Sequence, residues 1–509
     1  MEDQNYENIS HPDIDGFPIG LKEAVFGPVS LILGLLTANC LLFGGANLGF
    51  ALAMLGNLAV AAGYLRWSGH KGNWYSRVLL ILSALIIPGF VRSDDGFVKF
   101  VLLGFLFVSL NLGLVTMAGR NLWNPAGVRS LLDPFRGLFG LGFGKLGASF
   151  RGVRRSFTDG SPAARNTGAV ILGLAIAVPV LAVMIPLLMK ADAAFEGLLD
   201  LLPEFNGNEV LTTVVFGGFW GCVLFTRGLA LNHCVSGGMA PASDKKGVNP
   251  LTVNTALFSV CALYVVYLLS QLAYFVGGFS GILPEGYSLA QYARRGFFEM
   301  AWLCAINLLV MILGISLARK REGKRPLSTR LACLFLGLVT LFFVAASGAK
   351  MVMYIGAYGM TRLRVLTMVI VAFLGLTTAV VSLWLFLPRL PYMQVVMITA
   401  LLMGGAVLWT DVDTLVAGYN VEAYLSGSLE TVDVYYLSGL GSGAVPQIAR
   451  LASDAPDQEI RESAALVLEG RWVGAEDLRG WNYTDHTARE YLPGEPEDMT
   501  YDSDLPGEE

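Results

Sequence analysis

The sequence predicts an all-α fold: a polytopic integral membrane bundle of about eleven transmembrane helices, joined to a small C-terminal helical domain outside the membrane. The chain of 509 residues is 54% hydrophobic and only 15% charged. Its apolar residues form separate stretches, each long enough to cross a hydrocarbon core of roughly 30 Å as a helix. Residues 410–509 differ sharply, because they hold 21 Asp and Glu, five Arg and no Lys. Their net charge is −16, against −5 for the whole chain.

The apolar stretches predict the individual spans. We expect helices at 25–43, 44–65, 77–91, 97–118, 167–189, 211–231, 251–275, 297–318, 331–349, 366–387 and 391–409. The third span is short and holds Pro88 near its end, while Pro179 and Pro186 predict a kink in the fifth, because proline lacks a backbone donor. Within the spans or at their edges, six asparagines are expected to form helix–helix hydrogen bonds: Asn39, Asn47, Asn57, Asn111, Asn254 and Asn307.

The spans and the stretches between them predict six segments. These are an acidic N-terminal segment at 1–24, a first bundle of about four helices at 25–118, a basic linker at 119–165, a second bundle of about seven helices at 166–409, a small acidic helical domain at 410–492, and a disordered acidic tail at 493–509. The small domain should contain helices over Thr414–Leu425 and Gln458–Gly470, the second capped by Asp454. Gly217 and Gly221 have the spacing of close helix packing, which we expect within one chain rather than in a dimer.

Lys and Arg are spread unevenly over the loops, and this predicts the orientation. With a cytoplasmic N-terminus, 22 basic residues fall on the cytoplasmic side and eight on the other. Basic loops favour the cytoplasm. We therefore expect a multi-pass protein of the cell (cytoplasmic) membrane with segment 1–24 inside. An odd number of spans then places the 410–492 domain outside. Arg227 lies near the cytoplasmic end of its span and is expected to snorkel toward the interface.

The linker contains a basic amphipathic stretch, Leu131–Phe157, in which Leu and Phe are mixed with Lys and Arg. Such segments lie on anionic lipid, so we expect this one to bind the lipids of the cytoplasmic leaflet rather than to dock on a protein. It also holds a G-x-G-x-x-G match, Gly142–Gly147. A dinucleotide site needs a strand before this motif and a helix after it, and neither is predicted there.

Few residues have the pattern of a catalytic or metal site. The four histidines lie far apart in sequence, and the six cysteines have no metal-ligand spacing. We expect no metal, no cofactor and no bound nucleic acid, and the lipid bilayer is the one partner that the composition requires.

A group of basic residues is an exception to the rule that Lys and Arg favour the cytoplasmic side, because it falls on the predicted outer side. Acidic residues and tyrosines lie close to it in the sequence. Together these residues are Tyr292, Arg294, Arg295, Glu299, Lys350, Tyr354, Tyr358, Arg364, Asp411 and Asp413. A spacing of four places Arg295 and Glu299 on one helix face. The same spacing places Lys350, Tyr354 and Tyr358 on one face of another helix. We favour an ion-pair network that clamps the last spans to the C-terminal domain. The alternative is an outward-facing anion pocket that uses the arginine forks.

Some of these residues belong to blocks that resemble a known family. The blocks are Tyr292–Glu299, Ala357–Thr361 with Arg364, Tyr419–Asn420 and Trp481–Asn482. They are similar to a bacterial family of multipass membrane proteins known only as a domain of unknown function, over roughly residues 165–485. The resemblance implies a bacterial cytoplasmic-membrane protein and carries no catalytic role. Arg362 departs from the pattern, where a non-basic residue is expected, which makes it a weaker site candidate than Arg364.

Three functions follow from these features. We favour a non-enzymatic scaffold or sensor accessory of the cell envelope, whose acidic domain binds an envelope protein. The alternative is a transporter, or a lipid- or anion-handling membrane protein, that uses the outward-facing cluster. The least favoured is an intramembrane transferase with Glu299 or Asp411 as its base.

Overall fold

The computed structural model describes residues 16–159, 207–234, 248–278, 297–319, 326–471, 473 and 477–492, with single positions between 173 and 188. Over these residues the chain is helical and contains no β-strand. Ten described helices are long and apolar enough to cross a membrane, which confirms a polytopic helical membrane protein. They correspond to ten of the eleven predicted spans. The predicted fifth span, 167–189, lies almost wholly outside the described residues. So does most of the 1–24 segment, and the 493–509 segment lies outside them entirely.

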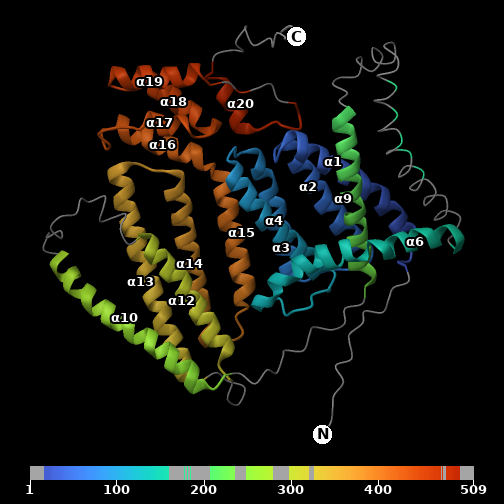
Figure 1. Cartoon of the computed structure of the whole chain (residues 1–509), viewed down its shortest axis with the longest axis horizontal. Coiled ribbons are helices and arrows are strands. Elements are labelled where there is room, and N and C mark those ends of the chain that lie inside the picture. The colour runs from blue at the N-terminus through green and yellow to red at the C-terminus, as the bar shows by residue number, and fades with distance from the viewer. Residues whose placement is uncertain are drawn as a thin grey trace, which may run out of the picture.

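Five of the long helices pack together in one group (Figure 1). They are α1 (Leu21–Gly44), α2 (Leu48–Trp67), α3 (Trp74–Ile86), α4 (Gly96–Met117) and α9 (Gly207–His233). The short predicted third span is completed by a 3-10 helix, η1 (Ile87–Val91), which holds Pro88 in its first turn, where proline costs no hydrogen bond.

Glycines bring α1 and α9 into backbone contact. A Cβ at Gly217 would lie 2.6 Å from Leu35 Cα, and one at Gly221 would lie 2.7 Å from Leu31 Cα. No side chain larger than hydrogen fits at such distances, so these glycines allow the backbones of α1 and α9 to approach closely. The two helices pack along most of their length. The prediction of close packing within one chain is confirmed at this pair.

A second group contains α10 (Pro250–Gly278), α12 (Phe297–Leu317), α13 (Leu327–Tyr358) and α14 (Arg362–Phe386). Helix α15 (Tyr392–Thr410) stands between the groups, packing on α14 and also on α3 and α4. Its Leu401 and Leu408 lie in the core of the first group. The grouping in space therefore differs from chain order, because α9 and α15 follow the linker in sequence but pack on helices that precede it.

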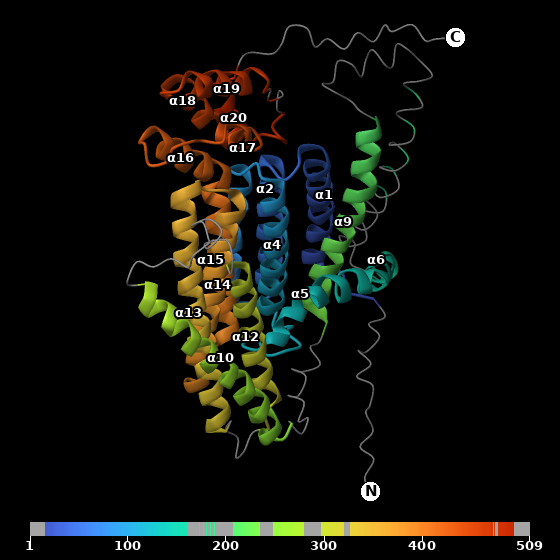
Figure 2. The same cartoon turned by 60° about the vertical axis from the view of Figure 1, so that its left-hand side comes forward.

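The linker lies across one end of the first group, with its last helix roughly perpendicular to α9 (Figure 2). It comprises η2 (Val128–Leu132), α5 (Asp133–Phe135), η3 (Arg136–Gly140), η4 (Phe143–Lys145) and α6 (Leu146–Asp159). At the start of the linker, Arg120 donates to the carbonyl oxygens of Leu231 (3.0 Å) and Asn232 (2.8 Å), near the end of α9. Asp133 is fully buried, and burial raises the pKa of its carboxyl. We call this side of the bundle the linker end.

The C-terminal helices form a small domain on the opposite side, which we call the tail end (Figures 1 and 2). They are α16 (Val412–Leu425), α17 (Val434–Ser438), the short η5 (Ser442–Ala444), α18 (Val445–Asp454), α19 (Gln458–Glu469) and α20 (Tyr483–Arg489). Helices α16 and α19 match the two predicted helices. The predicted cap is wrong: Asp454 ends α18, and Asp457 accepts from the Glu459 N–H instead (2.9 Å).

Candidate functional site

The predicted outer cluster does not form one pocket among the described residues. Tyr292, Arg294 and Arg295 lie outside them. Glu299 lies in the first turn of α12, and its charge acts on Lys350 of α13. The other members belong to two separate contacts at the tail end.

Arg364 holds the end of α13. Its guanidinium stacks on the Tyr354 ring, 4.1 Å from the centroid, and that ring packs on Tyr358 at 5.3 Å. Its Nη1 donates to the carbonyl oxygens of Tyr358 (3.1 Å) and Gly359. A helix end leaves such carbonyls without partners, and a basic side chain satisfies them well. Arg364 is thus engaged by its own chain.

Asp413 belongs to a buried ion-pair cluster that we call the clamp, made of Asp95, Arg362 and Asp413. Arg362 Nε lies 2.8 Å from Asp413 Oδ1 and 2.8 Å from Asp95 Oδ2, and its Nη2 lies 2.5 Å from Asp413 Oδ2. Both carboxylate side chains are 2% exposed, while Arg362 is 34% exposed. The clamp joins the starts of α4, α14 and α16. Arg362, which the sequence ranked below Arg364, is its one cation.

Asp411 has a structural role beside the clamp. Its Oδ2 accepts from Thr414 N (3.2 Å) and Thr414 Oγ1 (2.5 Å), so it caps α16. Its backbone has φ 50°, which L-residues rarely adopt. Burial raises the pKa of its carboxyl, since the charged form is costly away from water. The Cβ of any larger residue at Gly443 would collide with this carboxylate.

The residues that carry the family resemblance build the same junction. Asn420 accepts from Met360 N (2.6 Å) and donates to Met360 O (2.8 Å), which holds the turn between α13 and α14. Gly359 adopts φ 72° in that turn. Asn482 is fully buried and donates to Asn47 Oδ1 (3.1 Å) and Ser93 O (3.0 Å). These motif residues fix turns and docking contacts.

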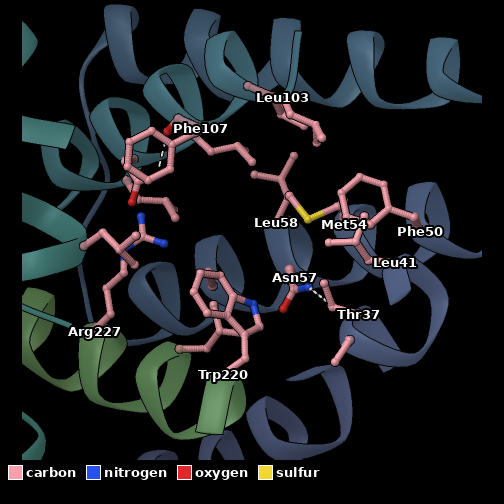
Figure 3. Close-up of a pocket in the computed structure, with 18 of the residues that line it drawn as sticks. Thr37, Leu41, Phe50, Met54, Asn57, Leu58, Leu103, Phe107, Trp220 and Arg227 are labelled. Carbon is pink, nitrogen blue, oxygen red and sulfur yellow. Dashed lines mark hydrogen bonds between the residues drawn. The ribbon is translucent and has the colours of Figure 1, made fainter. Parts of the chain in front are cut away.

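A cavity that the sequence did not predict lies inside the first group of helices. Its volume is about 430 Å³, within the usual range of ligand pockets. Figure 3 shows Arg227 at one end, Phe50 and Leu41 at the other, and Trp220 of α9 between them. Its walls come from α1, α2, α4, α9 and the linker, and they include Thr37, Ala38, Leu41, Leu42, Phe50, Met54, Asn57, Leu58, Ala61, Leu103, Phe107, Asn111, Leu114, Leu138, Phe216, Phe219 and Arg227.

Among the described residues that line the cavity, Arg227 alone is charged. It is 7% exposed, and its Nε and Nη2 are buried without a hydrogen-bond partner among those residues. The expected snorkelling does not occur. Helix α9 continues for six residues beyond Arg227, about 9 Å, and the side chain lies among Leu114, Leu138 and Leu224 instead.

Two asparagines add polar atoms to the cavity wall. Asn57 donates to Thr37 Oγ1 (2.7 Å), which joins α2 to α1 as predicted. Asn111 donates to the carbonyl of Phe107 in its own helix (2.6 Å), and its buried Oδ1 has no partner among the described residues. Asn39 joins α1 to α9 through Glu209 (3.0 Å). The prediction of helix–helix bonds is confirmed for Asn39 and Asn57 but wrong for Asn111. It is also confirmed for the other three asparagines, since Asn47 accepts from Lys99 of α4, Asn254 donates to Ser328 of α13 and Asn307 accepts from Tyr264 of α10.

A second polar cluster closes the linker end beyond Arg227. Buried Glu23 accepts from the Tyr64 hydroxyl (3.0 Å) and pairs with His233 Nε2 (3.2 Å). His70 contacts Asn232, which also donates to Tyr64. Two histidines that are distant in sequence thus meet around one asparagine. In the described part of the chain, no group of three or more His, Cys, Asp or Glu is placed to hold a metal.

These observations define a helical integral membrane protein with an apolar cavity, lined by a buried arginine for which the described part of the chain provides no hydrogen-bond partner at Nε and Nη2. The chain belongs to the family described as "Domain of unknown function (DUF4153)", whose model matches residues 58–451. The match starts within α2, earlier than the resemblance predicted, and ends within α18. Neither the curated proteins nor the solved structures include a match to this chain.

Proposed function

We propose that this protein binds an amphipathic anion of the lipid class in the cavity between α1, α2, α4 and α9. The observation that supports the proposal is Arg227, a buried cation whose Nε and Nη2 have no hydrogen-bond partner among the described residues and face an apolar chamber. This is the lipid- or anion-handling function, but at a site other than the predicted outer cluster.

The chemistry of the head group follows from Arg227. A guanidinium stays charged in proteins, and an arginine at the centre of a membrane helix costs about 2.5–3.5 kcal/mol on insertion scales. Nε and Nη2 form one edge of the planar guanidinium, which matches two oxygens of a carboxylate or a phosphate. An anion there would supply the missing partners.

The dimensions of the cavity favour a single acyl chain. Along α9 it extends from Phe216 to Arg227, eleven residues or about 16 Å of helix. This is close to half of a hydrocarbon core of roughly 30 Å, which is the depth of one leaflet. Leu, Phe and Met side chains form most of the wall, as an alkyl chain requires.

The linker supports a second lipid contact at the surface. Leu132, Phe135, Phe139 and Phe150 are exposed on it, next to the basic residues Lys145, Arg151, Arg154 and Arg155. An apolar face with basic neighbours binds anionic lipid surfaces. The linker end would then face the cytoplasm, with the C-terminal domain outside the cell membrane.

The predicted scaffold or sensor role remains a second candidate for the C-terminal domain. Tyr435 is 88% exposed and Leu466 is 67% exposed, on a domain with a strongly negative charge. Exposed aromatic residues are enriched at interfaces, and the acidic surface would favour a basic envelope partner.

Binding of cis-parinarate, a fluorescent fatty acid, tests the proposal in purified protein in phosphatidylcholine nanodiscs. We expect Arg227→Gln to weaken binding at least about tenfold, because hydrogen bonds to charged groups contribute about 1.5–3 kcal/mol. Ala61→Phe should also weaken binding, by filling the cavity while leaving Arg227 intact. Arg364→Gln is the matched control, since Arg364 is already paired.

Competition by a lysophosphatidate separates the two head groups. Stronger displacement by the lysophosphatidate than by a fatty acid would identify a phosphate, and the reverse a carboxylate. Equal parinarate binding by wild type, Arg227→Gln and Ala61→Phe would contradict the proposal.

A further inference from the structure

A short segment of the C-terminal domain lies against the turn that closes the cavity at the tail end. We call residues 477–482 the strap. The N–H of Leu48 donates to Trp481 O (3.2 Å) and the N–H of Gly49 donates to Arg479 O (3.1 Å). The first N–H groups of a helix have no partner within it. The strap carbonyls supply these partners for α2, whose Asn47 forms no side-chain cap among the described residues.

The strap also joins α1 to α9 through one side chain. Arg479 forms an ion pair with Glu209, in the first turn of α9, and donates to Asn39 Oδ1 of α1 (3.3 Å). Asn39 in turn donates to Glu209 (3.0 Å) and Thr213 (3.1 Å). Arg479 therefore fixes the separation of α1 and α9 at the tail end.

The fit between the strap and the helices is close. A Cβ at Gly44 would lie 2.8 Å from the carbonyl carbon of Arg479, and one at Gly49 would lie 3.0 Å from its Cα. Backbone contacts of this kind cannot absorb a shift of the α1–α2 turn, because no flexible side chain lies between them. A movement of that turn must move the strap.

The same turns form the wall of the cavity. Ala38 and Leu41 flank Asn39 on α1, and Phe50 follows Gly49 on α2, and all three line the cavity. The cavity is present in the structure in which the strap is docked. A ligand that occupies it and contacts Ala38, Leu41 and Phe50 would therefore favour this docked arrangement.

We infer that the strap couples occupancy of the cavity to docking of the C-terminal domain, so that the domain reports whether the ligand is bound. This inference rests on the proposed function. The coupling is reciprocal: a ligand that tightens the strap is itself bound more tightly when the strap is docked. Couplings between sites usually amount to about fivefold or more in affinity.

Hydrogen exchange on full-length protein in nanodiscs measures the coupling directly. We expect saturating cis-parinarate to slow exchange of the Leu48 and Gly49 amides about fivefold, because these amides exchange when the strap opens. By reciprocity, Arg479→Ala should weaken parinarate binding by the same factor. Arg450→Ala is the control, since its ion pair with Glu422 is exposed and belongs to the C-terminal domain alone.

The outcomes separate the inference from the proposed function. Slower exchange in wild type, absent in Arg227→Gln, supports both. Parinarate binding that depends on Arg227 but leaves the two amides unchanged refutes the coupling and leaves the binding site standing. Binding that is absent or independent of Arg227 overturns both. The wild-type exchange result holds even if Arg479→Ala fails to fold.

Discussion

The clamp gives the sharpest prediction for the docking of the C-terminal domain. Arg362→Met keeps an apolar stem of similar length and removes the charge, which leaves Asp95 and Asp413 without their cation. Loss of one partner from a buried ion pair costs about 3–5 kcal/mol. Arg362 is 34% exposed, so water offsets part of this cost and we expect the lower end, about 3 kcal/mol.

A loss of about 3 kcal/mol shifts the docked-to-undocked ratio by about 150-fold, since each 1.4 kcal/mol is a factor of ten. A protease that cleaves after glutamate is a suitable probe, because replacing Arg362 by methionine neither removes nor creates one of its sites. Its cleavage of the undocked domain tracks the population of that state when opening and closing are fast. We expect Arg362→Met to raise the cleavage rate in nanodiscs by about two orders of magnitude.

Arg450→Ala is the matched control. Its ion pair with Glu422 is exposed, at 43% and 63% for the two side chains, and such pairs contribute about 0–1 kcal/mol. Adding Asp95→Asn and Asp413→Asn to Arg362→Met should recover part of the loss, because the buried charges are then gone. Equal cleavage rates for Arg362→Met and Arg450→Ala would refute a stabilising role for the clamp.

Two further predictions concern helix packing and pH. Gly217→Ala should separate α1 from α9, at a cost of about 1–3 kcal/mol for overpacking, and should therefore weaken parinarate binding. Gly218→Ala is the control and should leave binding unchanged, because a Cβ at Gly218 would have no described atom within 4 Å. Burial raises the pKa of the Asp411 carboxyl. The protonated carboxyl therefore stabilises the docked state fully at a pH below the pKa of Asp411 in the unfolded chain, and this stabilisation is lost as the pH rises through its pKa in the folded protein. Asp411→Asn keeps an acceptor for Thr414 but cannot become charged. In thermal scans followed by proteolysis, the variant should undock at a higher temperature than wild type near pH 7.5 and at a similar temperature near pH 4. A constant difference in undocking temperature across this pH range would contradict the assignment.

The spans could be predicted from sequence because membrane crossing depends on local hydropathy. The grouping of helices could not, because it depends on contacts between distant segments. Gly217 and Gly221 signalled a close contact, but nothing in the sequence specified α1 as the partner. Helix α15 likewise packs on α3 and α4, which precede it by some 300 residues.

The candidate site, too, could be predicted from the sequence only in part, because its residues come from distant segments of the chain. The predicted cluster included Asp413. In the structure, the cation paired with Asp413 is Arg362, and the second carboxylate of the clamp is Asp95, which lies far away in sequence. Asp95 also caps α4 by accepting from Val98 N (2.9 Å), so it resembled an ordinary helix start. Arg227 carried a usable signal: a cation within an apolar span, with no acid within a turn of it to act as its partner.

The boundaries of the family match separate the two proposals physically. Residues 58–451 include Arg227, Asn111 and Ala61, which line the cavity where we propose that the anion binds. Asn39, Gly49 and the strap lie outside them, although together they form the contact that ties the C-terminal domain to the tail end of the cavity. The matched residues can therefore form the anion-binding end but cannot form the strap contact. Head-group recognition by Arg227 depends on α9 and α4, whereas the response of the domain depends on Arg479 reaching Glu209. Substitutions at Arg227 and Arg479 thus act on different physical steps, binding and its transmission.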